Sequence, residues 1–204
     1  GNNTINANGA SSSITTGDGA NTINVTGDYV TVRAGSGTDT IKVTGTNANV
    51  DTGAGNDNIT ASGANATIKA NNGDNKINST SEKSTITVGE GANSILLGGT
   101  ESTLVTGGGK NTITASGSSS TITTGNGNNT VDVKGNYVTV KTGSGTDTIK
   151  VTGTNANVDT GAGNDNITAS GANATIKAND GDNKINSTSE KSTITVGEGA
   201  NSIL

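Results

Sequence analysis

The chain has 204 residues, of which only 27% are hydrophobic, and it contains no Phe, Trp, Met, Cys, His or Pro. Twelve basic residues against seventeen acidic residues give a net charge of −5, which argues against a nucleic-acid partner. The lack of cysteine excludes disulfides and thiolate metal sites, and no apolar run is long enough to predict membrane insertion.

Glycine recurs every eighteen residues from Gly1 to Gly199 without interruption. This spacing divides the chain into eleven complete coils and the first six residues of a twelfth. A low apolar content alone is typical of disorder, but isolated Ile and Val at fixed positions of every coil indicate a repeat structure. The sequence therefore predicts an all-β fold over residues 1–204, a single parallel β-solenoid of about 11 coils with two short strands per coil.

The third coil, residues 37–54, illustrates the elements in chain order. Residues 40–43 alternate polar and apolar side chains, so Ile41 and Val43 are expected to point inward as parts of a first strand. Val50, nine residues after Ile41, marks the second strand, and Gly45 and Gly53 mark the turns, where glycine is expected to supply positive φ angles. Two inner columns of small or branched residues complete the predicted core: Ala7, Val25, Val43, Ala61 and Ser79 in one, and Ala34, Thr52, Ala70 and Val88 in the other.

A slower repeat overlies the coils. Residues 37–96 reappear as residues 145–204, and the only difference is Asn72 in the first copy against Asp180 in the second. We interpret this as a block duplication, with blocks 1–108 and 109–204, inside a longer array. Exposed columns should alternate in charge along the axis, because opposite charges on adjacent strands stabilise pairing. The expected pairings are Arg33 with Asp51 and Lys69, Lys141 with Asp159 and Lys177, Asp132 with Lys150, and Lys83 with Glu101.

One turn of each coil has the pattern G-x-G-x-[N/D]-x-U, where U is aliphatic, as in residues 35–41 and 53–59. This pattern resembles the RTX nonapeptide repeat of secreted bacterial toxins, proteases and adhesins. The resemblance implies a β-roll around calcium, with Asp carboxylates and turn carbonyls as ligands. It covers the whole chain in period, but only one of the two turns of each coil in detail.

The position that would bind calcium carries Asn in most coils, and Asp only at Asp39, Asp57, Asp147 and Asp165. One hypothesis is that each adjacent Asp pair holds a calcium ion between neighbouring turns. The alternative, which the many Asn residues favour, is a ladder of amide hydrogen bonds along the axis, with the carboxylates capped by backbone N–H groups. The opposite turn has small or aliphatic residues at this position, such as Ala48 and Ala66, and should bind no calcium.

The coils contain no His, no Cys and no insertion, so we expect no enzymatic activity and no catalytic residues. The sequence predicts a structural segment of a secreted or cell-surface bacterial protein, such as a rod, stalk, surface layer or filament. Its partners would be further copies or repeats of the same chain.

Two alternatives remain open for the function. The first is a calcium-stabilised RTX-like adhesin or binding module. The second is an ice-binding surface, for which a column of threonines is suitable but is interrupted by charges in the neighbouring column. Tyr29 and Tyr137, the only aromatic residues, are candidate contact points for a neighbouring protein or a glycan.

Overall fold

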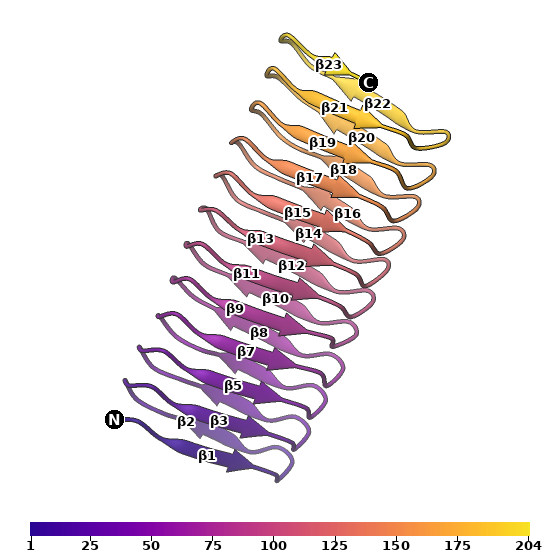
Figure 1. Cartoon of the computed structure of the whole chain (residues 1–204). Coiled ribbons are helices and arrows are strands. Elements are labelled where there is room, and N and C mark those ends of the chain that lie inside the picture. The colour runs from indigo at the N-terminus through magenta and orange to yellow at the C-terminus, as the bar shows by residue number, and fades with distance from the viewer.

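The computed structural model describes all residues 1–204 and shows a straight stack of coils with its termini at opposite ends (Figure 1). Two parallel sheets face one another, and the chain passes from one sheet to the other twice in every coil. The predicted all-β parallel solenoid is thus confirmed, with about eleven turns of eighteen residues. The structure has no helix long and apolar enough to cross a membrane.

The first sheet contains the twelve odd-numbered strands in sequence order. They are β1 (Thr4–Ala7), β3 (Thr22–Val25), β5 (Thr40–Val43), β7 (Asn58–Ala61), β9 (Lys76–Ser79), β11 (Ser94–Leu97), β13 (Thr112–Ala115), β15 (Thr130–Val133), β17 (Thr148–Val151), β19 (Asn166–Ala169), β21 (Lys184–Ser187) and β23 (Ser202–Ile203).

The second sheet contains the eleven even-numbered strands, also in sequence order. They are β2 (Ser13–Thr15), β4 (Thr31–Arg33), β6 (Asn49–Asp51), β8 (Thr67–Ala70), β10 (Thr85–Val88), β12 (Thr103–Thr106), β14 (Thr121–Thr123), β16 (Thr139–Lys141), β18 (Asn157–Asp159), β20 (Thr175–Ala178) and β22 (Thr193–Val196).

Every strand pairs with its equivalent one coil away, so residues eighteen apart are neighbours, as Ile23 and Ile41 are. The hydrogen bonds extend beyond the strands. Of 125 backbone hydrogen bonds, 55 lie within strands and 70 lie in turns and connections, where for example the Gly37 N–H donates to Ala54 O at 2.9 Å. The turns are therefore stacked as regularly as the strands, and a side chain in a turn has a fixed neighbour in the next coil.

The core is a thin layer of aliphatic side chains between the sheets. The predicted inward positions Ile41, Val43 and Val50 are all buried, and they belong to one continuous cluster of 37 buried hydrophobic residues. Because neighbouring strands are about 4.8 Å apart, each aliphatic side chain packs on its equivalents above and below, which forms a ladder along the axis. Ala34 of the predicted inner column is only partly buried.

The turns correct one sequence prediction. Gly37 and Gly55 have φ angles of 137° and 138°, as expected for turn glycines. Gly45 does not have a positive φ; instead, a Cβ added there would overlap the carbonyl oxygen of Gly27 in the coil before. Close approach of stacked backbones therefore demands this glycine, and the left-handed residue of that turn is Asn47, with φ 54°.

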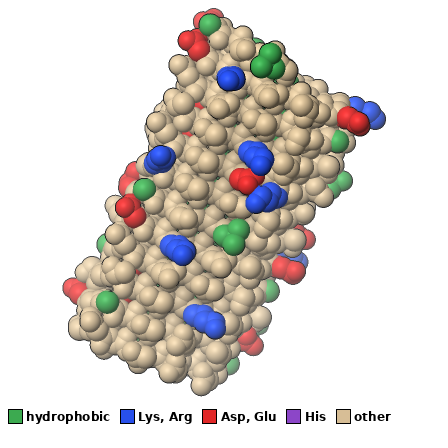
Figure 2. Space-filling model, in the orientation of Figure 1, with side chains coloured by type: hydrophobic (Ala, Val, Ile, Leu, Met, Phe, Trp, Pro, Cys, Tyr) green, Lys and Arg blue, Asp and Glu red, His purple; other side chains and the backbone are tan.

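The charged side chains are dispersed over the visible face and the hydrophobic ones are mostly isolated (Figure 2). Three predicted ion pairs are present: Lys69 with Asp51 at 3.6 Å, Lys177 with Asp159 at 3.6 Å, and Lys83 with Glu101 at 3.8 Å. Asp132 and Lys150 are adjacent in register as predicted, but the carboxylate of Asp132 instead pairs with Lys134 on its own coil, at 3.3 Å.

Candidate metal centre

The predicted metal-binding residues lie in the turns that lead from the second sheet back to the first. Asp39 follows β4 and precedes β5, and Asp57 occupies the equivalent turn of the next coil. The Asp39 N–H donates to Asp57 Oδ1 at 2.9 Å, and the Asp147 N–H donates to Asp165 Oδ1 at 2.9 Å. All four side chains are at most 1% exposed. The structure thus brings the residues together as two buried pairs, one in each block.

The Asn residues of the same column form the predicted amide ladder. The Asn21 amide nitrogen donates to Gly17 O at 3.1 Å, to Gly19 O at 3.0 Å and to the side-chain oxygen of the next coil, Asp39 Oδ1, at 2.8 Å. The amide nitrogen of Asn93 repeats this pattern with Gly89, Gly91 and Asn111. An Asn side chain therefore satisfies its own turn and the neighbouring coil without any ion.

An Asp in this column lacks the donor that the turn requires. Gly35 O and Gly37 O occupy the positions that receive the amide in an Asn coil, and no hydrogen bond reaches them. Oδ2 of Asp39 is buried and has no hydrogen-bond partner, and the same holds for Oδ2 of Asp147. Each pair therefore gathers carboxylate and carbonyl oxygens that no protein donor satisfies.

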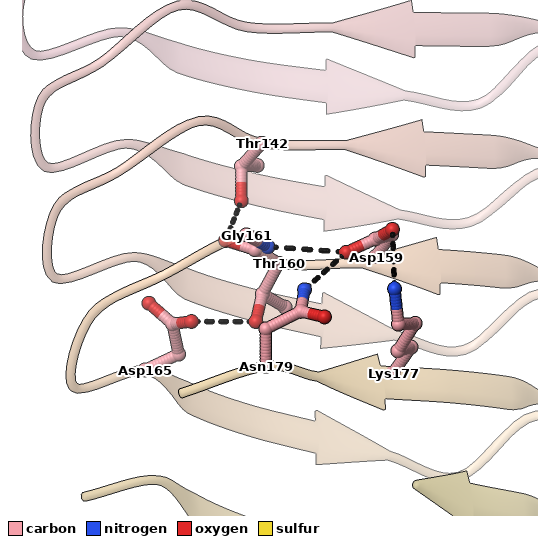
Figure 3. A network of polar contacts seen from close by, with 7 residues as sticks. All are labelled: Thr142, Asp159, Thr160, Gly161, Asp165, Lys177 and Asn179. Atoms are coloured by element: carbon pink, nitrogen blue, oxygen red, sulfur yellow. Dashed lines mark hydrogen bonds and ion pairs between the residues drawn. The ribbon is translucent and has the colours of Figure 1, made fainter. Parts of the chain in front are cut away.

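The second Asp of each pair has a hydroxyl partner, which Figure 3 shows for Asp165. The Thr160 hydroxyl donates to Asp165 Oδ2, as Thr52 does to Asp57. Gly161, with φ 73°, turns the chain at this point, and its N–H donates to Asp159 at 3.2 Å. Asn179 donates to the same carboxylate at 2.6 Å. This network fixes the turn that carries Thr160 and so orients Asp165.

Burial shifts the pKa of three of these carboxyl groups. Burial raises the pKa of Asp57 and of Asp165 above the ordinary value of 3.8, in spite of the hydrogen bonds that they accept. Burial also raises the pKa of Asp147, although Asn129 donates hydrogen bonds to it. A raised pKa means that the folded chain disfavours the bare carboxylate, so a bound proton or a cation would stabilise these turns.

The opposite turn differs from the turn that carries the Asp pairs. Ala48 and Ala66 are buried at the corresponding position. Ser84 and Ser102 replace them further along, and their hydroxyls lie 3.0 Å apart in a hydrogen-bonded ladder. No group of three or more acidic side chains is placed to hold an ion. A ligand set at these turns would combine one Asp pair with backbone carbonyls.

The family model of the RTX calcium-binding nonapeptide repeat, which has four copies, matches residues 1–32, 15–45, 51–86, 105–135 and 159–190. These segments cover more than half of the chain. The chain belongs to the RTX calcium-binding nonapeptide repeat family. No curated protein matches it.

The RTX family implies calcium, and the oxygens at the Asp pairs fit that ion. Calcium takes six to eight oxygen ligands, mainly carboxylates and carbonyls. In the first block, Asp39 and Asp57 offer carboxylates, and Gly35, Gly37 and Gly53 are among the residues whose carbonyls lack donors. In most other coils the Asn amide points a donor group at these carbonyls, which excludes a cation. The RTX matches include all the Asp residues of the pairs except Asp147, whose sequence context is that of Asp39.

Sequence reasoning identified the Asp pairs but missed the residues that orient them. In the sequence analysis, Thr52 is placed in the core and Asp51 is paired with Lys69, and no role is given to Asn71. In the structure, Asn71 donates to Asp51 at 2.8 Å, and Thr52 donates to Asp57. The sequence did contain a signal for this contact. Asn71 and Asn179 occupy a turn position that is glycine in all the other coils, and each lies in the coil that follows Asp51 or Asp159.

Proposed function

We propose that the chain is a rod-shaped spacer segment of a secreted or cell-surface bacterial protein, in which calcium at two Asp pairs reinforces a stack held mainly by Asn ladders. The RTX solenoid is a structural, calcium-binding fold, and the chain is a repeat segment of that kind. The observation that carries the proposal is the contrast within one column. Asn amides satisfy the turn carbonyls in most coils, whereas the four Asp residues leave them without a donor.

A mechanical role agrees with the uniformity of the coils. Every coil has eighteen residues, and no loop interrupts the stack (Figure 1). The Asp pairs are almost fully buried under the turns, so a substrate would not reach them, and the proposal assigns no catalysis to them. Reach along the axis, with one coil adding about 4.8 Å, is what this architecture supplies.

The proposed location follows from the chemistry of the ion. A site with two carboxylates and backbone carbonyls resembles the weaker class of calcium sites, which fill at the millimolar concentrations found outside cells. The RTX family occurs in secreted bacterial proteins, which supports the same location. Self-association completes the proposal, because every coil stacks on an equivalent coil, so further coils of the same kind can extend the same two sheets.

The test is thermal unfolding followed by circular dichroism, with millimolar calcium and then with excess chelator. We expect a β-rich spectrum in both conditions and a lower unfolding midpoint in chelator, because the Asn ladders remain when the ion is removed. Collapse to a disordered spectrum in chelator would contradict the self-sufficient ladder. An identical midpoint in both conditions would contradict the calcium sites. Sedimentation of the folded chain at rising concentration would separately test self-association.

A further inference from the structure

In every coil, the turn that leads from the first sheet to the second carries one residue of a row that we call the tip row. Its side chains are exposed except those of Asn47 and Asn155, which are half-buried. Each member has a left-handed backbone, with φ between 53° and 58°. In chain order, the tip row consists of Ser11, Tyr29, Asn47, Asn65, Lys83, Glu101, Ser119, Tyr137, Asn155, Asn173 and Lys191. It therefore contains both aromatic residues of the chain, at equivalent places in the two blocks.

The fold itself gives no reason for a tyrosine at these places. A left-handed backbone is unfavourable for a bulky side chain and is best tolerated by Gly, Asn and Asp. Tyr29 is 64% exposed and Tyr137 is 62% exposed, and neither phenol makes a hydrogen bond within the chain. At the same position, the coil before each tyrosine has Ser and the coil after it has Asn. Two exposed rings kept at a backbone position that disfavours them indicate a role outside the fold.

The polar residues next to Tyr29 are held in a defined arrangement. The Asn65 amide donates to Asn47 Oδ1 at 3.2 Å, and the Asn47 amide donates to Thr46 Oγ1 at 3.2 Å. Thr46 Oγ1 in turn donates to Asp28 Oδ1 at 2.9 Å. This chain of hydrogen bonds orders the amides in advance, while Asn65 remains exposed. A ring and two ordered amides therefore follow one another along the edge, about 4.8 Å apart.

The second block repeats the arrangement around Tyr137 in part. Asn136 stands where the first block has Asp28, and no hydrogen bond joins Asn173 to Asn155. The Asn155 amide donates to Thr154 Oγ1 at 3.4 Å, and the Thr154 N–H donates to Asn136 Oδ1 at 2.9 Å. Asn173 is exposed at the place equivalent to Asn65. Because the blocks differ by six coils, the two tyrosines are separated by about 29 Å along the same edge.

We propose that these two stretches of the tip row are contact sites for a neutral, linear polysaccharide that lies along the edge of the solenoid. The C–H groups on the face of a sugar ring carry partial positive charge and pack on the negative face of an aromatic ring. The coil spacing is close to the length of one sugar unit in an extended glycan. A sugar stacked on Tyr29 thus places the hydroxyls of the next two units near the amides of Asn47 and Asn65. The carboxylate of Asp28 at the first site, and the net charge of −5 of the whole chain, disfavour an acidic glycan.

Two equivalent sites on one rigid edge give a bivalent surface. Each site is small and open, so a single site binds weakly, whereas a polymer that reaches both gains from the high effective concentration of the second. The sites lie on the turn opposite the Asp pairs, and the inference is therefore independent of calcium binding.

The test uses the tyrosines as their own probes, because the chain contains no Trp and no Phe. Tyrosine emission is recorded while a panel of neutral oligosaccharides of three or more β-linked glucose or N-acetylglucosamine units is added. Retention on the corresponding insoluble polysaccharides is measured in parallel. We expect at least one oligosaccharide to change the emission, and its polymer to retain the folded chain.

The variants separate ring stacking from folding. In the double variant Tyr29→Asn with Tyr137→Asn, retention should fall at least tenfold while the unfolding midpoint stays equal or rises, because Asn suits the left-handed backbone. The matched control Ser11→Asn with Ser119→Asn changes the same row and should bind as wild type. Tyr29→Phe with Tyr137→Phe should keep most of the retention. The proposal is overturned if no oligosaccharide of the panel changes the tyrosine emission, or if the double Asn variant binds as wild type. It is also overturned if the emission changes only with protein concentration, because that result would indicate contact between copies of the chain.

Discussion

Replacing the first Asp of each pair with Asn should make the chain more stable without calcium and largely insensitive to it. In Asp39→Asn, the new amide can donate to the two turn carbonyls and to Asp57, as the Asn21 amide does at 3.1, 3.0 and 2.8 Å. Three hydrogen bonds at about 1 kcal/mol each give about 3 kcal/mol per site. For a chain of this size, that corresponds to a rise of roughly 6–12 °C in unfolding midpoint for each site.

The measurement is thermal unfolding of the double variant Asp39→Asn with Asp147→Asn, in chelator and in calcium. The parent should gain stability from calcium, and the variant should show a high midpoint in both conditions. The matched control Asp74→Asn with Asp182→Asn changes exposed carboxylates in the equivalent turns of other coils. These accept hydrogen bonds from Ala92 and Ala200 at 2.7 and 2.8 Å, which an Asn oxygen also accepts, so little change is expected. A double variant that is less stable than the parent in chelator, or that responds equally to calcium, would refute the reasoning.

Three further predictions concern pH, the turn glycines and the threonine hydroxyls. The carboxyl groups of Asp57, Asp147 and Asp165 have raised pKa values in the folded chain, so their protonated form favours the fold. The stability that they contribute is present at low pH and is lost as the pH increases from 3.8 through the folded pKa values. In chelator, the unfolding midpoint should therefore rise as the pH is lowered from about 7 toward about 4. A midpoint in chelator that falls over this range would contradict the pH prediction. Gly45→Ala should lower the free energy of unfolding by about 3 kcal/mol or more in a urea titration, because the new Cβ overlaps Gly27 O. Gly17→Ala, with open space around its Cβ, should have little effect. Equal effects of the two substitutions would show that close approach of the backbones is not the cause. Thr52→Val with Thr160→Val should lower the free energy of unfolding in chelator by about 1–3 kcal/mol per site, because each substitution removes the hydroxyl donor of a buried carboxylate. The same urea titration measures this loss. An unchanged midpoint would contradict the role of the two threonines in positioning Asp57 and Asp165.

The period of eighteen and the strand alternation were sufficient to predict the architecture. Ile41, Val43 and Val50 were placed in the core from periodicity alone, because a stacked coil repeats its side-chain directions without change. The register of the charged columns followed for the same reason. Asp132 was assigned the wrong ion partner, since the reach of a flexible Lys134 on its own coil is not visible in the register.

The turns were harder to predict because their geometry depends on contacts between coils. The glycine at position 45 is required by the backbone of the coil below, a constraint that single-coil reasoning about φ does not contain. Similarly, the link from Asn71 to Asp51 joins residues twenty apart, so it falls outside the eighteen-residue comparison that revealed the columns. The Asp pairs could be identified in the sequence. That Oδ2 of Asp39 lacks a hydrogen-bond partner could not, because it depends on how the amide ladder ends at this turn.

We propose that calcium acts at two Asp pairs of a rod that otherwise holds itself together. The most direct test is the stoichiometry of calcium binding, measured by isothermal titration calorimetry on folded, calcium-free chain. Two ions per chain are expected, falling to one in Asp39→Asn and to none when Asp147→Asn is added. A binding number near the number of coils, or no binding by a chain that remains folded, would contradict the account.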